Sequence, residues 1–211
     1  MHKLLLTLLI IGSGLNLSAQ YPGYTPLSDL SKFKALFSVE AQKVISIKSD
    51  FTQEKNLSML SEKILSQGKF WFKKDSRVRM EYTKPFTYLM IINKDKVFVK
   101  DGQKENTIST KSNKLFQQIN KITVDCVQGT VLTNPDFSTR VFENKGAYLV
   151  ELSPVSKNLK EFFKTIVVTV DKKDYSVTNI EMNENSGDNT IIHFINKEMN
   201  TNLPDALFAI N

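Results

Sequence analysis

The chain has 211 residues, a formal net charge of +6, and 41% hydrophobic and 24% charged residues, which is typical of an ordinary globular domain and not of a disordered chain. A single cysteine excludes an intramolecular disulfide, and the two histidines argue against a zinc site or a histidine-based catalytic triad. The basic residues are spread along the chain in short pairs beside acids, which does not indicate a nucleic-acid-binding surface.

The N-terminus has the pattern of a secretory signal peptide. Lys3 precedes an apolar run over residues 4–11, and small and polar residues follow as far as Ala19. The run is shorter than the roughly 20 apolar residues that span a membrane, although an uncleaved anchor is the alternative. We expect residues 1–19 to be a cleaved signal peptide and residues 20–211 to form one domain.

The first element expected after the signal is a helix over about residues 28–44. Ser28 or Asp29 can cap its N-terminus. The apolar positions that follow recur with the spacing of one helical face, which predicts a helix lying on a sheet. These positions are Leu30, Phe33, Leu36, Phe37 and Ala41.

From about residue 44 the apolar period changes to two, which predicts antiparallel strands. Residues 77–83 alternate most clearly, with Val78, Met80 and Tyr82 on one face. Gly68 indicates a bulge or bend inside a long strand. The strands expected in this half cover about residues 44–54, 59–74, 77–83, 86–93 and 96–100.

Residues 111–125 return to helical spacing and predict a second helix, with Ser112 as its cap. Its apolar stripe consists of Leu115, Phe116, Ile119 and Ile122. Cys126, at the end of this helix, is expected to be a small buried residue. After the helix, a polar loop is expected over residues 154–161. Strands are expected over residues 137–143, 147–153, 164–171, 175–183, 189–197 and 205–210.

About ten or eleven antiparallel strands and two helices predict a mainly β (α+β) fold in which a long sheet curls and the helices cover its concave face. The alternation assigns eight large side chains to that face: Phe51, Phe70, Phe72, Val78, Met80, Tyr82, Leu89 and Ile91. The stripe of the second helix would cover them as a lid. Two interpretations stay open, a filled core, which apolar stripes most often form, or an incompletely filled cavity for an apolar ligand.

Four motifs occur in a characteristic order along the chain. They are Phe51-Thr52-Gln53 within residues 49–55; the glycine-led strand at 68–73 with Arg79, Tyr82 and Pro85 after it; Tyr148 to Pro154; and residues 187–208, which end in Pro204 and Phe208. Together they resemble the LolA family of periplasmic lipoprotein carriers over about residues 28–210. The resemblance implies an unclosed antiparallel β-barrel with helices over its mouth and an apolar cavity.

The resemblance also implies a function and partners. Family members carry the acyl chains of outer-membrane lipoproteins across the periplasm, between an inner-membrane release complex and an outer-membrane receptor. We also expect a monomer that has no catalytic residues, cofactor or metal and that does not bind nucleic acid. Lys74 stands where family carriers often have an arginine that holds the lid, and it is therefore a candidate lid latch, as a point donor without the planar fork of arginine.

Three other functions stay open. A specialised paralogue could carry a pathway-specific lipid, which the departure at Lys74 favours, and a sensor of lipid or lipoprotein could use the same fold. An enzyme would need perturbed carboxylates in a pocket. The acids Glu181, Glu184 and Asp188 lie at an expected turn, where solvated side chains are the simplest interpretation. No Walker, Gly-x-Ser-x-Gly or dinucleotide-binding motif is present.

Overall fold

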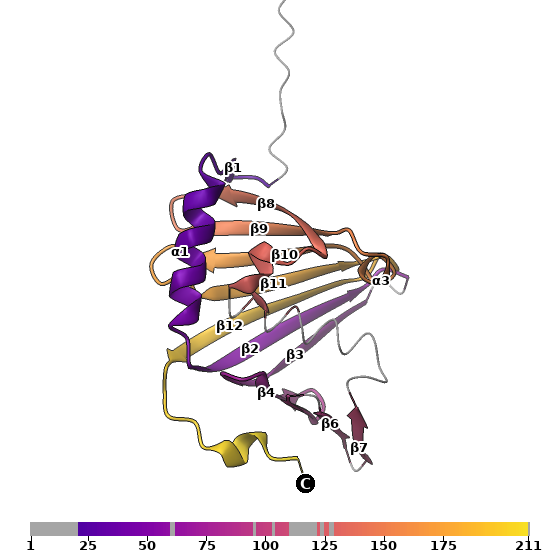
Figure 1. The fold of residues 1–211 in the computed structure, drawn as a ribbon. Coiled ribbons are helices and arrows are strands. Elements are labelled where there is room, and N and C mark those ends of the chain that lie inside the picture. Colours follow the sequence, from indigo (N-terminus) through magenta and orange to yellow (C-terminus); the bar gives the residue numbers. More distant parts are fainter. Residues whose placement is uncertain are drawn as a thin grey trace, which may run out of the picture.

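A computed structural model of the chain describes residues 21–59, 62–94, 96–102, 104–109, 122, 125–126 and 129–210. These residues form one twelve-stranded antiparallel sheet (Figure 1). The strand order is β1-β8-β9-β10-β11-β12-β2-β3-β4-β5-β6-β7, so β1 and β7 form its two edges and the sheet is not closed into a barrel. The expected mainly β fold with an unclosed sheet is therefore confirmed.

The strands of the N-terminal half are β1 (Thr25–Pro26), β2 (Ser46–Leu57), β3 (Glu62–Lys73), β4 (Arg77–Lys84), β5 (Tyr88–Asn93), β6 (Lys96–Asp101) and β7 (Lys104–Ser109). Those of the C-terminal half are β8 (Phe137–Glu143), β9 (Ala147–Pro154), β10 (Phe163–Asp171), β11 (Val177–Glu184) and β12 (Asn189–Met199). Strand β12 pairs with β2 and joins the two halves. The register between β3 and β4 shifts between Gln67 and Gly68, which confirms the irregularity expected at Gly68.

Helix α1 (Leu30–Gln42) lies across one end of the sheet (Figure 1). The Asp29 carboxylate accepts a hydrogen bond from the backbone N–H of Lys32 at 2.9 Å and so caps its N-terminus. Phe33, Phe37 and Ala41 are its buried residues. The expected amphipathic helix on the sheet is confirmed. The short helix α3 (Lys157–Lys160) lies at the other end, inside the segment expected to be a loop.

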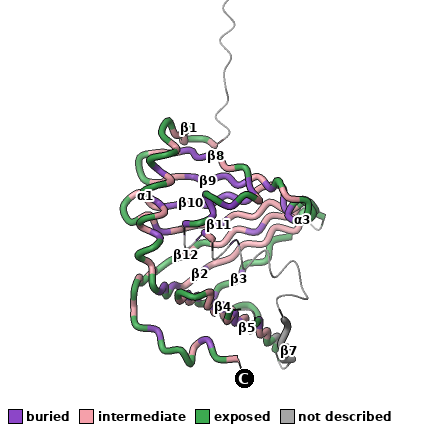
Figure 2. The backbone as a smooth tube through the Cα atoms, in the orientation of Figure 1, coloured by how far each residue is buried: buried purple, intermediate pink, exposed green. Residues whose placement is uncertain are grey.

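Two apolar clusters occupy the face of the sheet that α1 covers. One lies beneath α1 against β8–β11, and the other lies on β2–β6. Figure 2 shows buried segments along β8, β9 and β10. The half-buried ring of Phe194 on β12 packs against both clusters. The core is thus continuous across the strand that joins the two halves.

The prediction of a strand over residues 205–210 is wrong. Asp205–Phe208 form the 3₁₀ helix η3, which packs on the opposite face of the sheet. Phe208 is buried there with Ile91 and Leu203, and its carbonyl accepts from the Asn93 side-chain amide at 2.9 Å. An apolar patch on the outer side of β3, β5 and β6, formed by Trp71, Leu89, Ile91 and Phe98, therefore holds this segment in place of a neighbouring strand.

Some expectations lie outside the described residues. They are the signal peptide over 1–19 and most of the second helix over 111–125. Another short 3₁₀ helix, η2 (Thr130–Thr133), precedes β8. In the part of the chain that the structure describes, no helix is long and apolar enough to cross a bilayer.

Candidate ligand-binding cavity

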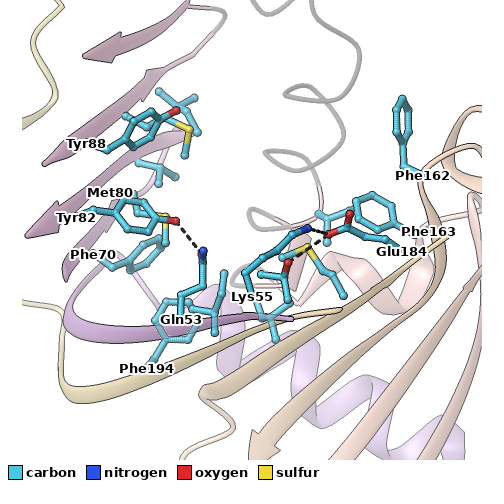
Figure 3. Close-up of a pocket in the computed structure, with 18 residues that line it drawn as sticks. Gln53, Lys55, Phe70, Met80, Tyr82, Tyr88, Phe162, Phe163, Glu184 and Phe194 are labelled. Atoms are coloured by element: carbon cyan, nitrogen blue, oxygen red, sulfur yellow. Dashed lines mark hydrogen bonds and ion pairs between the residues drawn. The ribbon is translucent and has the colours of Figure 1, made fainter. Parts of the chain in front are cut away.

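A cavity of about 410 Å³ lies between the β2–β5 wall and the β10–β12 wall, on the face that α1 covers (Figure 3). Its volume is within the range typical of small-molecule sites. Most of its lining is apolar or aromatic. The lining residues are Gln53, Lys55, Phe70, Val78, Met80, Tyr82, Tyr88, Met90, Ile92, Ile122, Phe162, Phe163, Ile180, Met182, Glu184, Thr190, Ile192 and Phe194.

The pairing of β4 and β5 explains one wall. Met80 lies directly opposite Met90, and Val78 lies opposite Ile92. Directly opposed residues of antiparallel strands project from the same face of a sheet, so the two strands present one continuous apolar surface to the cavity. Methionine side chains are flexible and polarisable, and such a surface can adapt to ligands of different shape.

The structure places four of the eight predicted wall residues in the cavity lining: Phe70, Val78, Met80 and Tyr82. Phe51 and Phe72 are fully buried in the same cluster, behind the lining. Their ligand contact stays a prediction.

Leu89 and Ile91 lie on the opposite face, under η3, and the face predicted for them is wrong. Tyr82 pairs with Tyr88, so the even-numbered residues of β5 share the face of Tyr82 and the odd-numbered ones do not. A shift of one residue moves every side chain of a strand to the other face. Met90 and Ile92 therefore line the cavity where Leu89 and Ile91 were expected.

Of the predicted lid residues, only Ile122 belongs to the described part of the chain. Its side chain is 3% exposed and lines the cavity. Leu115, Phe116 and Ile119 lie outside the described residues, and their role stays a prediction. Cys126 is fully buried as expected, and this burial raises the pKa of its thiol far above the usual range, which makes it unreactive.

The candidate latch Lys74 donates its ammonium to the carbonyl of Gln42, the last residue of α1, at 3.1 Å. A lysine at this place satisfies a free carbonyl at the C-terminus of a helix. The described contact therefore joins Lys74 to α1, and a latch between Lys74 and the second helix stays a prediction.

Aromatic side chains form one end of the cavity. The ring of Tyr82 meets Phe51 edge to face with centroids 5.0 Å apart and meets Tyr88 at 5.6 Å. Its hydroxyl donates to the side-chain oxygen of Gln53 at 2.8 Å. Burial, together with the neighbouring Tyr88, raises the pKa of Tyr82 well above its usual range, so its phenol stays neutral.

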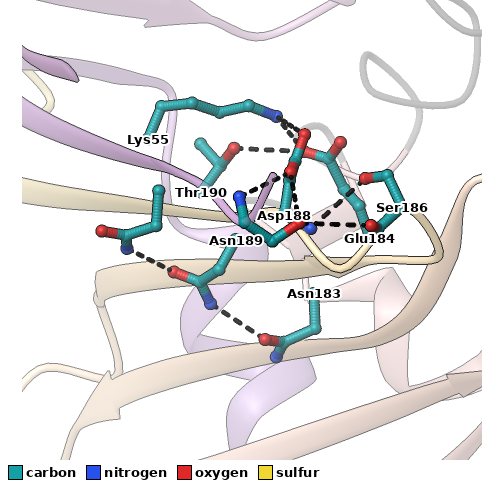
Figure 4. Close-up of polar contacts among 9 residues, drawn as sticks. Lys55, Asn183, Glu184, Ser186, Asp188, Asn189 and Thr190 are labelled. Carbon is teal, nitrogen blue, oxygen red and sulfur yellow. Dashed lines mark hydrogen bonds and ion pairs between the residues drawn. The ribbon is translucent and has the colours of Figure 1, made fainter. Parts of the chain in front are cut away.

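The other end is polar and was not recognised in the sequence. The side chain of Lys55 on β2 extends over the neighbouring strand β12. Its ammonium lies 2.5 Å from Oε1 of Glu184, at the end of β11 (Figure 3). The hydroxyl of Thr190 donates to the same oxygen at 3.2 Å. Asp188 lies 3.9 Å from the ammonium. Figure 4 shows this group of contacts around the β11–β12 turn. Glu184 therefore lies in the cavity lining, in contrast to the solvated turn position expected for it.

The arrangement can shelter an apolar ligand and hold a polar group at one end. No group of three or more His, Cys, Asp or Glu residues that could hold a metal ion occurs within the described ranges. The chemistry that the lining supplies is hydrophobic contact and hydrogen bonding.

Comparison with known proteins gives one family match. Residues 42–211 match the family model described as "Outer membrane lipoprotein carrier protein LolA". No curated protein sequence matches the chain.

Solved structures resemble the fold at low sequence identity. A DUF1329 family protein from Desulfovibrio piger has a TM-score of 0.51 at 15% identity, over 86% of this chain and 98% of that one. The MucA/MucB complex of Pseudomonas aeruginosa has a TM-score of 0.51 at 9% identity, over 85% of this chain and 60% of that one. A LolA superfamily protein from Nitrosomonas europaea has a TM-score of 0.47 at 10% identity, over 84% and 97% of the two chains.

Proposed function

The chain belongs to the LolA family of outer membrane lipoprotein carrier proteins, and from this premise we propose that it is a periplasmic carrier of acyl chains. Its cargo is a lipoprotein or a related lipid. The acyl chains lie in the cavity between the β2–β5 and β10–β12 walls, and the carrier moves them toward the outer membrane without covalent chemistry.

The single observation that supports this proposal most is the largely apolar cavity of about 410 Å³ on the covered face of the sheet. A space of this size favours the incompletely filled cavity over a filled core, since protein interiors pack as densely as organic crystals. Removal of each methylene of an acyl chain from water is worth about 0.8 kcal/mol. A chain of a dozen carbons can therefore be held firmly by contacts with this lining alone.

A carrier must also release what it binds. We propose that the segment over residues 111–125 covers the cavity when it is empty and gives way to the ligand, with Ile122 as the described residue that reaches the lining. An inner-membrane release complex would then load the cavity, and an outer-membrane receptor would empty it. The signal peptide over 1–19 would bring the chain to the periplasm.

Native mass spectrometry of the mature protein, purified from the periplasm of a bacterium that makes lipoproteins, tests the proposal. We expect an additional mass of a lipid or lipoprotein on the unaltered protein. Met182→Glu places a carboxylate in the cavity lining and should remove that mass. Met59→Glu is the matched control because Met59 is 92% exposed, and this variant should keep the ligand.

The carrier proposal would be overturned if the purified protein carried no additional mass and also did not bind added acyl chains. In that case a sensor that binds another protein becomes the better interpretation. Retention of the mass by both the Met182→Glu and the Met59→Glu variants would show that the ligand binds elsewhere on the molecule.

A further inference from the structure

The polar end of the cavity carries an unbalanced charge. Among the described lining residues only Lys55 and Glu184 are charged. Their ion pair at 2.5 Å is flanked by Asp188, 3.9 Å from the same ammonium. Among the described residues, two carboxylates therefore share one ammonium, and these three side chains together carry one negative charge.

Both carboxylates stay in place through further contacts. The backbone N–H and the hydroxyl of Ser58 donate to Oδ1 of Asp188 at 3.0 and 3.1 Å. The backbone hydrogen bond from Ser58 is the main cause that holds the pKa of Asp188 below its usual range. Asp188 is therefore ionised at neutral pH. Its hydrogen bonds with Ser58 join the β2–β3 and β11–β12 turns beside the cavity.

Glu184 retains capacity to accept hydrogen bonds. Lys55 and Thr190 both donate to its Oε1 atom. An ionised carboxylate offers about four acceptor positions on its two oxygens, so Oε2 can accept donors from a ligand. A hydrogen bond to a charged acceptor is stronger than one between neutral groups, and most so where water is excluded.

We infer that the Lys55–Glu184 end of the cavity binds the polar head of an acylated ligand that carries hydroxyl or amide N–H donors and no negative charge. The acyl chain of the same ligand lies along the methionine and aromatic wall. This inference rests on the proposed carrier function and narrows its cargo. A free fatty acid or another acyl anion is disfavoured, because its head would meet two carboxylates and an ammonium that already has partners.

Three ligands with the same dodecanoyl chain and different heads test this inference. They are 1-monododecanoylglycerol, dodecanoate and methyl dodecanoate, each titrated into delipidated protein against the fluorescent probe N-phenyl-1-naphthylamine. We expect the glycerol ester to bind about tenfold more tightly than either of the others, as one or two charge-assisted hydrogen bonds would produce.

Glu184→Gln should shift the preference. It removes one of the two carboxylate charges and frees the Lys55 ammonium, so the affinity for dodecanoate should rise about tenfold. Glu181→Gln is the matched control, because Glu181 stands on the same strand with its side chain on the other face of the sheet. Lys55→Met should have the opposite effect. It should bind dodecanoate more weakly than the unaltered protein does, and so increase the preference for the glycerol ester.

The two proposals fail in different ways. If none of the three ligands displaces the probe from the unaltered protein, the carrier proposal fails. If all three bind with equal affinity, or if dodecanoate binds best, the carrier proposal stands and the inference about the head is overturned. The ranking on the unaltered protein decides this even if Glu184→Gln does not fold.

Discussion

The ring of Phe51 on β2 lies 2.8 Å from the position that a Cβ atom on Gly68 of β3 would occupy. The two residues are directly opposed in the sheet, and the backbone carbonyl of Glu81 lies only 2.0 Å from the same position. Gly68 also marks the register shift between β3 and β4. The absence of a side chain here lets the fully buried Phe51 ring fill the space behind the cavity lining.

Gly68→Ala should therefore destabilise the fold by at least about 2 kcal/mol, since the new methyl group would force the β3–β4 backbones apart. The free energy of unfolding in urea measures this. Gly146→Ala is the control, because the nearest atom to its added Cβ is 4.0 Å away, and it should change stability by no more than about 0.5 kcal/mol. Equal stability of the two variants would contradict this account of Gly68.

Neighbouring isoleucines on β5 should separate stability from binding. Ile92 lines the cavity, whereas Ile91 packs beneath η3, and the two are 3% and 4% exposed. Ile92→Thr should weaken binding of the dodecanoyl glycerol ester about fourfold, as expected from the loss of one methylene contact. Both variants should lower the free energy of unfolding to a similar degree, because both side chains are buried. Ile91→Thr should leave the affinity for the ester unchanged. Weaker binding in both variants would mean that the outer face also contacts the ligand.

Sequence periodicity predicts most of this fold for a physical reason. Strands with one buried face alternate, so the faces of Val78, Met80 and Tyr82 could be assigned from β4 alone. The face of β5 depends on how many residues the turn between the strands contains before pairing resumes at Tyr88, and alternation within β5 does not determine this. Alternation alone therefore predicts the wrong face for Leu89 and Ile91.

Sequence patterns do not predict the polar end of the cavity or the position of η3. Lys55 and Glu184 are 129 residues apart, and they meet only because β12 pairs with β2. Leu207 and Phe208 have the apolar character of a strand, but the patch that receives them is formed by β3, β5 and β6. Contacts of this kind depend on the order of the strands, which local composition does not encode.

Glu151 and Arg140 form an ion pair on the outer face of the sheet. The carboxylate is 1% exposed, and it accepts from Arg140 at 2.5 and 3.0 Å and from the Tyr21 hydroxyl at 2.5 Å. Arg140→Ala should lower the free energy of unfolding by about 2 kcal/mol. This value is smaller than for a fully buried ion pair because part of the guanidinium is exposed. Lys69→Ala breaks the exposed pair with Asp50 and should cost at most about 0.5 kcal/mol. Urea unfolding compares the two, and equal costs would contradict the importance of burial.

Asp205 should make the attachment of η3 sensitive to acid. Its hydrogen bond with Lys73 is the main cause that lowers its pKa, and Arg77 adds to it at 2.8 Å. A lowered pKa contributes stability above the unfolded value near 4, and this contribution disappears as the pH falls through the folded value. The protection of the backbone amides of residues 203–210 against hydrogen exchange, relative to their intrinsic rate at each pH, should therefore fall below about pH 4, and also in Asp205→Asn at neutral pH. Asp75→Asn, which alters the longer 3.7 Å contact to Arg77, should leave exchange unchanged.

Tyr82 should make stability fall at alkaline pH. Burial keeps its phenol protonated in the folded protein above the unfolded pKa of about 10. Its contribution is complete below that pH and is lost as the pH rises toward the folded value, by up to about 1.4 kcal/mol per pH unit. Tyr82→Phe loses the hydrogen bond to Gln53, worth about 1 kcal/mol at neutral pH, but its stability should fall less steeply above pH 10.

Urea unfolding at intervals from pH 8 to 11.5 measures both slopes. Tyr21→Phe should also make the free energy of unfolding fall less steeply above pH 10, because burial and the Glu151 hydrogen bond raise the pKa of Tyr21. The two effects should add in the double variant, since the residues lie on opposite faces of the sheet. Parallel curves for Tyr82→Phe and the unaltered protein would mean that the cavity admits enough water to ionise Tyr82. The aromatic end would then be a poor shelter for an acyl chain.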